Sequence, residues 1–89
     1  MLFELGRAVA TATVLAALQD RPGLIQTALP RHALGDWGDI SEADRQANDL
    51  ALGHGARLLG ACRFDEELTL WVLTEADRLA TTVMLRQDD

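Results

Sequence analysis

Apolar residues recur at two different spacings along the chain, and the spacing changes near residue 55. Before that point they recur every three or four positions, as in the run Val14, Leu15 and Leu18, which is the period of an amphipathic helix. After it, apolar and polar residues tend to alternate, which is the period of a β-strand. The pattern predicts an α+β fold in which an N-terminal strand and helices pack on a C-terminal antiparallel β-meander, built mainly from residues 56–86.

The first part of the chain carries start and stop signals for short helices. Thr11 or Thr13 is placed to cap the first helix, and Pro30 is expected to limit the second. Ser41 is expected to cap the third, because its hydroxyl can accept a hydrogen bond from the backbone three residues on. The expected elements are a strand over residues 2–9 and helices over residues 11–19, 24–29 and 41–52.

The third helix is expected to be amphipathic with a thin apolar stripe. Gly53 and Gly55 lie just beyond it and are expected to stop it. Its two faces are predicted to consist of Ala43, Ala47, Leu50 and Ala51 on the apolar side and Asp44, Arg45, Asn48 and Asp49 on the polar side.

The C-terminal part is expected to form three strands, over residues 56–64, 68–74 and 78–85. Their short connections predict antiparallel pairing. The middle strand is apolar on both faces, whereas a half-exposed strand would alternate more cleanly. We therefore expect helices to cover one side of the sheet and a partner or a second copy to cover the other, which predicts a homodimer.

Length and composition predict one small domain spanning residues 1–89. The single cysteine, Cys62, excludes an internal disulfide, so no oxidising compartment is needed. No apolar run approaches the roughly 20 residues of a membrane-spanning helix. We expect the protein to be cytoplasmic.

Charge is unevenly distributed. The chain has 14 acidic residues against 8 basic ones, all of them arginine, and a net charge of −6. An acidic surface repels phosphates, which disfavours direct nucleic-acid binding and favours a basic groove on a protein partner. The predicted partner-binding residues are Asp65, Glu66, Glu67, Glu75 and Asp77, with Asp36, Trp37 and Asp39 as a second patch. Trp37 either folds back as a lid on the core or is offered to the partner.

The sequence lacks the usual signs of catalysis. His32, His54 and Cys62 do not have the spacing of a zinc site, and a dyad of Cys62 with His54 would lack an orienting third group. The segment from Gly53 to Gly55 precedes a predicted strand, unlike a phosphate-binding loop. We expect a protein that is not an enzyme and needs no metal or cofactor, with a small enzyme using Cys62 or His54 as a remaining alternative.

The segments around the two tryptophans, Trp37 and Trp71, resemble those of a known protein family. Arg31-His32 with Gly35-Asp-Trp-Gly38, and Trp71-Val-Leu-Thr-Glu-Ala-Asp-Arg78 with Thr81-Thr82, resemble a family of small uncharacterised proteins from bacterial plasmids and integrated elements. The resemblance implies a mobile-element setting, where small acidic proteins often inhibit host defence. It suggests an anti-CRISPR-like or antirestriction-like inhibitor whose acidic residues compete with DNA for a defence complex. The alternative is a plasmid accessory or regulatory module that acts as a dimer through its sheet, without nucleic-acid mimicry.

Overall fold

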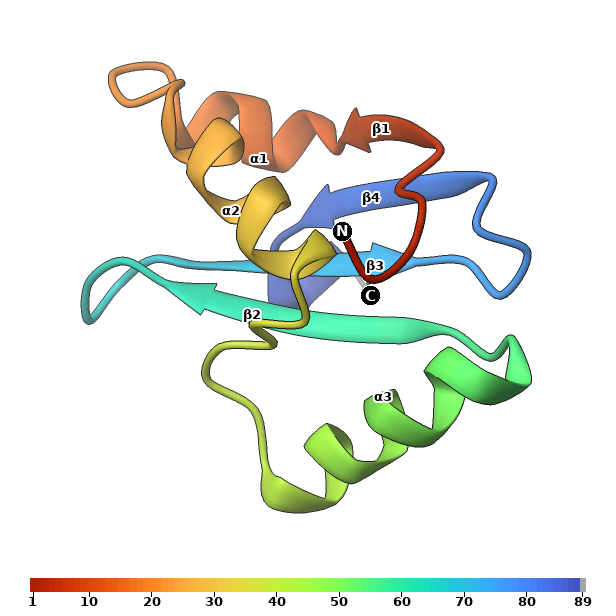
Figure 1. The fold of residues 1–89 in the computed structure, drawn as a ribbon. Helices are drawn as coiled ribbons and strands as arrows, with labels where there is room; N and C mark the ends of the chain where they lie inside the picture. Colours follow the sequence, from red (N-terminus) through yellow and green to blue (C-terminus); the bar gives the residue numbers. More distant parts are fainter. Residues whose placement is uncertain (89) are drawn as a thin grey trace.

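A computed structural model describes residues 1–88 as an α+β fold, the class predicted from the sequence (Figure 1). No helix within these residues is long and apolar enough to cross a membrane. The elements follow one another as β1 (Arg7–Ala10), α1 (Ala12–Ala17), α2 (Leu24–Ala33), α3 (Glu42–His54), β2 (Leu58–Arg63), β3 (Thr69–Thr74), β4 (Ala80–Met84) and the 3₁₀-helix η1 (Arg86–Asp88).

The strands form one mixed sheet in the order β1-β4-β3-β2. β2, β3 and β4 make the predicted antiparallel meander, in which Trp71 lies between Ala61 and Met84 on the neighbouring strands. β1 joins the edge of this sheet parallel to β4 and is not a separate layer upon it. Gly6 permits this pairing, because its φ is +65° and a Cβ there would collide with the backbone of Leu79.

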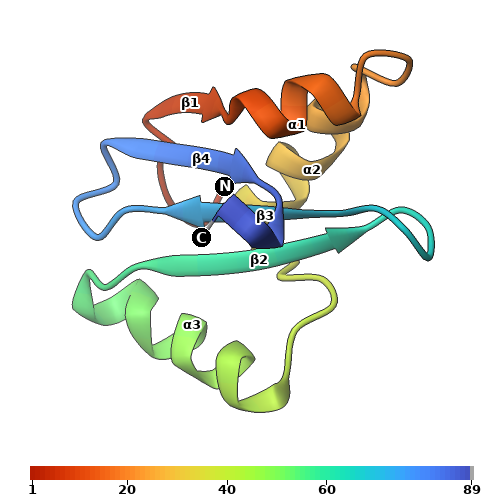
Figure 2. The same cartoon turned by 180° about the vertical axis from the view of Figure 1, so that it is seen from behind.

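α1 and α2 cover one face of the sheet and enclose the main core (Figure 1). Leu70 and Val72 of β3 are buried against Val14 and Leu18, which lie in and just after α1. Burying a side chain of this size contributes about 1.5–3 kcal/mol to stability. Seen from behind, η1 lies in front of the other face of the sheet and contacts β3 (Figure 2).

The predicted start of α1 is confirmed, whereas the predicted end of α2 is wrong. Thr11 caps α1, since its hydroxyl oxygen accepts a hydrogen bond from the backbone N–H of Val14 at 3.3 Å. The prediction that Pro30 ends α2 is wrong, because the helix continues to Ala33. Proline leaves the carbonyl four residues earlier, on Gln26, without its usual helical donor. Both residues are exposed, so water can supply that hydrogen bond.

α3 begins and ends on the predicted signals. The Ser41 hydroxyl oxygen accepts from the Asp44 N–H at 3.1 Å, and Gly55, with φ of +70°, ends the helix.

The predicted faces of α3 are correct for Ala51, which is buried, and for Asp44 and Asp49, which are exposed, but wrong for other residues. Leu50 of the expected apolar face is 64% exposed, and Ala43 and Ala47 are exposed with it, whereas Asn48 of the expected polar face is 4% exposed. The Asn48 amide donates to the Leu59 carbonyl at 2.7 Å and accepts from the Leu59 N–H at 3.1 Å. An edge strand has unpaired donors and acceptors, and an amide side chain satisfies one of each.

Candidate functional site

The two predicted acidic segments lie at opposite ends of the sheet. Residues 65–67 connect β2 to β3, and residues 75–77 belong to the connection between β3 and β4. Successive turns of an antiparallel meander alternate between the ends of a sheet. The five C-terminal carboxylates therefore do not form one patch.

Two of these carboxylates hold the turns together. Asp65 accepts hydrogen bonds from the N–H groups of Glu67 and Leu68, both at 2.8 Å, and forms an ion pair with Arg21 at 3.2 Å. The Glu67 N–H and then the Arg21 guanidinium lower the pKa of Asp65. Asp77 accepts from the Leu79 N–H at 2.9 Å. Asp65 and Asp77 thus have structural partners within their own turns.

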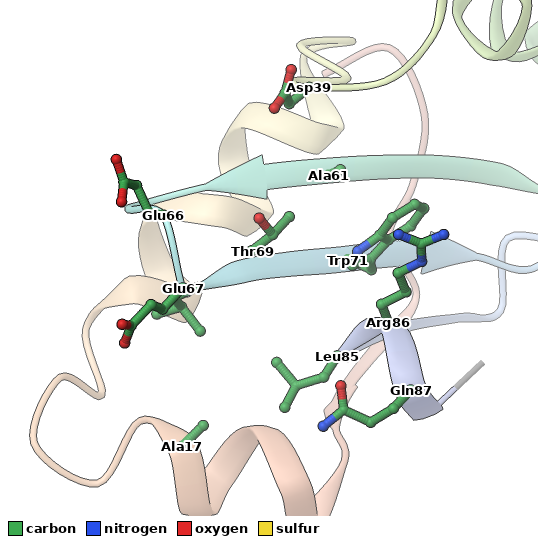
Figure 3. A pocket seen from close by; sticks show the side chains of 11 residues that line it. Ala17, Asp39, Ala61, Glu66, Glu67, Thr69, Trp71, Leu85, Arg86 and Gln87 are labelled. Carbon is green, nitrogen blue, oxygen red and sulfur yellow. The ribbon is translucent and has the colours of Figure 1, made fainter.

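The other predicted C-terminal acids have no such partner. Glu66, Glu67 and Glu75 are exposed, and within residues 1–88 their carboxylates form no hydrogen bond or ion pair. Glu66 and Glu67 project from the tip of the β2–β3 hairpin (Figure 3). This tip offers two adjacent carboxylates to solvent, whereas the opposite end of the sheet offers Glu75.

Trp37 is a lid on the core and is not offered to a partner. Its side chain is 2% exposed, so the prediction that it contacts a partner is wrong for this structure. The indole stacks on Phe3 with ring centroids 6.0 Å apart and meets His32 edge to face at 5.4 Å. Its N–H donates to Asp49 at 3.3 Å. Burial of a large aromatic ring together with a satisfied N–H explains why the loop folds inward.

The loop around Trp37 also pairs with β2. The Ala61 N–H donates to the Trp37 carbonyl at 2.9 Å, and the Asp39 N–H donates to the Ala61 carbonyl at 2.8 Å. Gly38 is required between them, because its φ is +77° and a Cβ would collide with the Ala61 carbonyl. The loop therefore covers part of the β2 edge.

The two acids beside Trp37 have different surroundings. Asp36 forms an ion pair with Arg31 at 2.8 Å, and this hydrogen bond is the main cause of the lowered pKa of Asp36. Arg31 also donates to the sulfur of Cys62 at 3.0 Å. Asp39 is exposed, and in the described chain its carboxylate has no bonded partner. Of the second predicted patch, Asp39 alone remains free for a partner.

A hollow of about 400 Å³ lies beside the β2–β3 turn, between the end of α1, η1 and β3 (Figure 3). Asp39, Glu66 and Glu67 line one side of it, while Arg86 and Trp71 belong to the rest of its lining. The structure thus brings together three of the four free acids from the two predicted patches, and leaves Glu75 at the opposite end of the sheet. Neither Trp71 nor Arg86 was predicted as a site residue. The apolar pattern on both faces of residues 68–73 nevertheless predicted that one side of the strand containing Trp71 is covered by a partner or a second copy.

His32 belongs to a buried chain of hydrogen bonds and lies out of reach of solvent. The Thr81 hydroxyl donates to the Leu5 carbonyl at 2.7 Å, which leaves its oxygen to accept from Thr74 at 2.8 Å. Thr74 in turn accepts from Nε2–H of His32 at 3.0 Å, which places a proton on Nε2. Burial lowers the pKa of His32 to about 4, and its Nδ1 has no hydrogen-bond partner. This geometry indicates a structural histidine.

The other candidate chemical groups are separated. Cys62 is buried in β2, whereas His54 is exposed at the end of α3, and no hydrogen bond links them in the described residues. Residues 1–88 contain no group of three His, Cys, Asp or Glu side chains arranged to hold a metal ion. The expected lack of enzymatic activity and of a metal stays a prediction.

The chain matches no protein-family model, no curated protein and no solved structure. The resemblance to plasmid-encoded proteins gains no support from these comparisons and also stays a prediction.

Proposed function

We propose that the protein is a non-enzymatic binding protein that contacts a basic surface on a protein partner through the β2–β3 turn. The observation that carries the proposal is the pair of exposed, unbonded carboxylates of Glu66 and Glu67 at the hairpin tip, with Asp39 beside the same hollow. Asp65 fixes the backbone of this turn, so the two glutamates are held on an ordered support.

Charge supports a basic protein as the partner in preference to a nucleic acid. The net charge of −6 repels phosphates and attracts an arginine- or lysine-lined surface. Proteins use arginine- and lysine-lined grooves to bind the DNA backbone, so a protein that occupies such a groove would displace DNA. In the mobile-element setting that the resemblance implies, this partner is a host defence complex, and the protein is an anti-CRISPR-like or antirestriction-like inhibitor.

Protection of a plasmid in living cells tests the proposal. Cells carrying a CRISPR–Cas or restriction system receive a plasmid with its target sequence, with and without this protein. Expression should raise the transformation efficiency, and the Glu66→Lys/Glu67→Lys variant should lose that effect. Glu4→Lys/Glu75→Lys is the matched control, because it makes the same change in net charge at two exposed positions that lie near the opposite end of the sheet and have no bonded partner within residues 1–88. Equal protection by both variants would contradict a contact at this turn.

A dimeric accessory or regulatory module is the second candidate. The partly exposed side of β3 favours it, since Trp71 and Leu73 alternate with the buried Leu70 and Val72 and so lie on the face of the sheet opposite α1 and α2. Ionic strength separates the candidates. A contact made by surface charges weakens with added salt, because the Debye length falls from about 10 Å at 0.1 M to about 3 Å at 1 M. A hydrophobic sheet contact persists.

A further inference from the structure

The last described turn of the chain, η1, forms one wall of the hollow beside the β2–β3 turn. Leu85, Arg86 and Gln87 line this hollow together with Trp71 of β3. η1 contacts β3, and Figure 3 shows the Arg86 side chain reaching toward the Trp71 ring. Trp71 is only half-buried, so the position of η1 limits how much of its ring a partner can reach.

One carboxylate oxygen attaches η1 to the rest of the fold. Oδ2 of Asp88 accepts hydrogen bonds from the hydroxyl of Thr11 at 2.8 Å and from the hydroxyl of Thr13. The same oxygen accepts from the backbone N–H of Leu85 at 2.9 Å. Hydrogen bonds to an ionised acceptor are stronger than those between neutral groups. Asp88 thus joins η1 to the start of α1, which lies 75 or more residues earlier in the chain.

Apolar burial contributes little to this attachment. Arg86 and Gln87 are exposed, and η1 contains no buried residue. Leu85, which packs against the main core, is the last apolar residue before η1. Segments with few buried apolar contacts open locally at a small cost in free energy. The hydrogen bonds of Asp88 therefore decide whether η1 stays against the hollow.

We propose that residues 86–88 form a strap that closes the hollow, and that release of the strap uncovers Trp71 as an aromatic anchor for an arginine of the basic partner. Tryptophan is enriched among the residues that dominate binding energy at protein interfaces. A guanidinium suits the opened hollow, because it pairs with carboxylates and stacks on aromatic rings. The identity of this occupant rests on the proposed function, whereas the strap itself does not.

The charges that line the hollow support an internal competitor for that arginine. Arg86 is the only cation among the described lining residues, which also include the free acids Asp39, Glu66 and Glu67. No ion pair joins Arg86 to any of these three acids. With the strap closed, Arg86 lies where it repels a second guanidinium. With the strap open, the acids and the indole remain without that positive charge.

Amide hydrogen exchange of the full chain, followed by nuclear magnetic resonance, tests the strap without any partner. In Asp88→Ala the Leu85 N–H loses its acceptor and should exchange about tenfold faster or more. The Trp71 indole N–H signal should shift, while exchange of the Val72 N–H within the sheet stays unchanged. Glu75→Ala is the matched control, because it removes an exposed carboxylate with no bonded partner in residues 1–88. Equal Leu85 exchange in the two variants would overturn the proposal.

Thr13→Val supplies a milder second variant, which removes one donor and keeps the Asp88 carboxylate. It should shift the Trp71 indole signal in the same direction as Asp88→Ala, but less. Combining the two substitutions should add little to the shift of Asp88→Ala alone, because both break the same contact. Fully additive shifts would contradict a strap held by this contact.

Displacement of DNA from a defence complex tests the occupant of the opened hollow. Asp88→Ala should displace DNA at a lower concentration than wild type, and Trp71→Leu/Asp88→Ala should lose that gain. Unchanged displacement by Asp88→Ala, in a variant whose strap is open by hydrogen exchange, would overturn the role of Trp71 as an anchor. If neither wild type nor Asp88→Ala displaces DNA, the proposed function and the arginine occupant fail together, whereas the exchange data decide the strap independently.

Discussion

Replacing Asn48 by alanine should destabilise the protein, because this one side chain joins α3 to the edge of the sheet. The amide makes two hydrogen bonds to Leu59, and each contributes about 1 kcal/mol net. Leaving the Leu59 N–H and carbonyl without these partners adds a further cost, which is limited because Leu59 is only partly buried. The higher helix propensity of alanine offsets about 0.5 kcal/mol of the loss in the free energy of unfolding. The expected loss is therefore about 2 kcal/mol, or roughly 8–16 °C in melting temperature for a domain of this size.

Urea unfolding followed by circular dichroism at pH 7 measures this loss. Gln46→Ala, an exposed substitution in the same helix, is the control and should change stability by less than about 0.5 kcal/mol. Asn48→Asp adds a pH test, because an ionised carboxylate cannot donate to the Leu59 carbonyl whereas a protonated one can. The aspartate variant should therefore recover stability relative to wild type as pH falls through the carboxyl pKa. A loss below 0.5 kcal/mol for Asn48→Ala would refute the role assigned to this amide.

Three further predictions follow from the buried histidine, the hairpin turn and the tryptophan loop. Because the pKa of His32 is about 4 in the folded protein against 6.5 when unfolded, the unfolded chain binds the proton first, and stability should fall by about 3 kcal/mol as pH drops from 6.5 to 4. His32→Gln should flatten this slope in urea titrations between those pH values, and an unchanged slope would show that another group causes it. Asp65→Ala should lower the melting temperature through loss of its turn hydrogen bonds, while Glu66→Ala should not; equal melting temperatures would contradict the structural role of Asp65. Gly38→Ala should cost more than about 1 kcal/mol and disturb the near-ultraviolet signal of Trp37, because the backbone there has positive φ; a native spectrum with unchanged stability would argue against the loop geometry.

Local signals in the sequence predicted local structure well. Thr11 and Ser41 cap helices because a short hydroxyl side chain reaches an unpaired N–H at the helix start. The alternation after residue 56 predicted the three-stranded meander, since residues two apart share a face and the connections are short. Such features depend on a few neighbouring residues, so the sequence alone is enough to identify them.

Features that depend on distant partners were predicted less well. α3 buries Asn48 in place of Leu50 because the edge of β2 presents unpaired backbone groups, which no helical pattern within residues 42–54 can reveal. α2 passes through Pro30 because His32 and Ala33 are buried beyond it and hold the last turn in place. In both cases tertiary contacts outweigh local preference.

The candidate site was predicted in part for the same reason. The sequence identified the acids but not which of them the turns would use, so Asp65 and Asp77 were grouped with the free Glu66 and Glu67. Only the folded chain shows that Asp39 lines the same hollow as those two glutamates, because the loop 37–39 must first pair with β2.

The most direct test of the proposed acidic contact is competition with DNA for a purified defence complex at two salt concentrations. The complex is taken from whichever system the protein protects a plasmid against, and the amount of protein needed to displace half of a labelled target DNA is measured. We expect wild type and Glu4→Lys/Glu75→Lys to displace DNA at low salt and less effectively at high salt, and Glu66→Lys/Glu67→Lys to fail at both. Displacement by the Glu66→Lys/Glu67→Lys variant equal to that of wild type would contradict a contact through the β2–β3 turn.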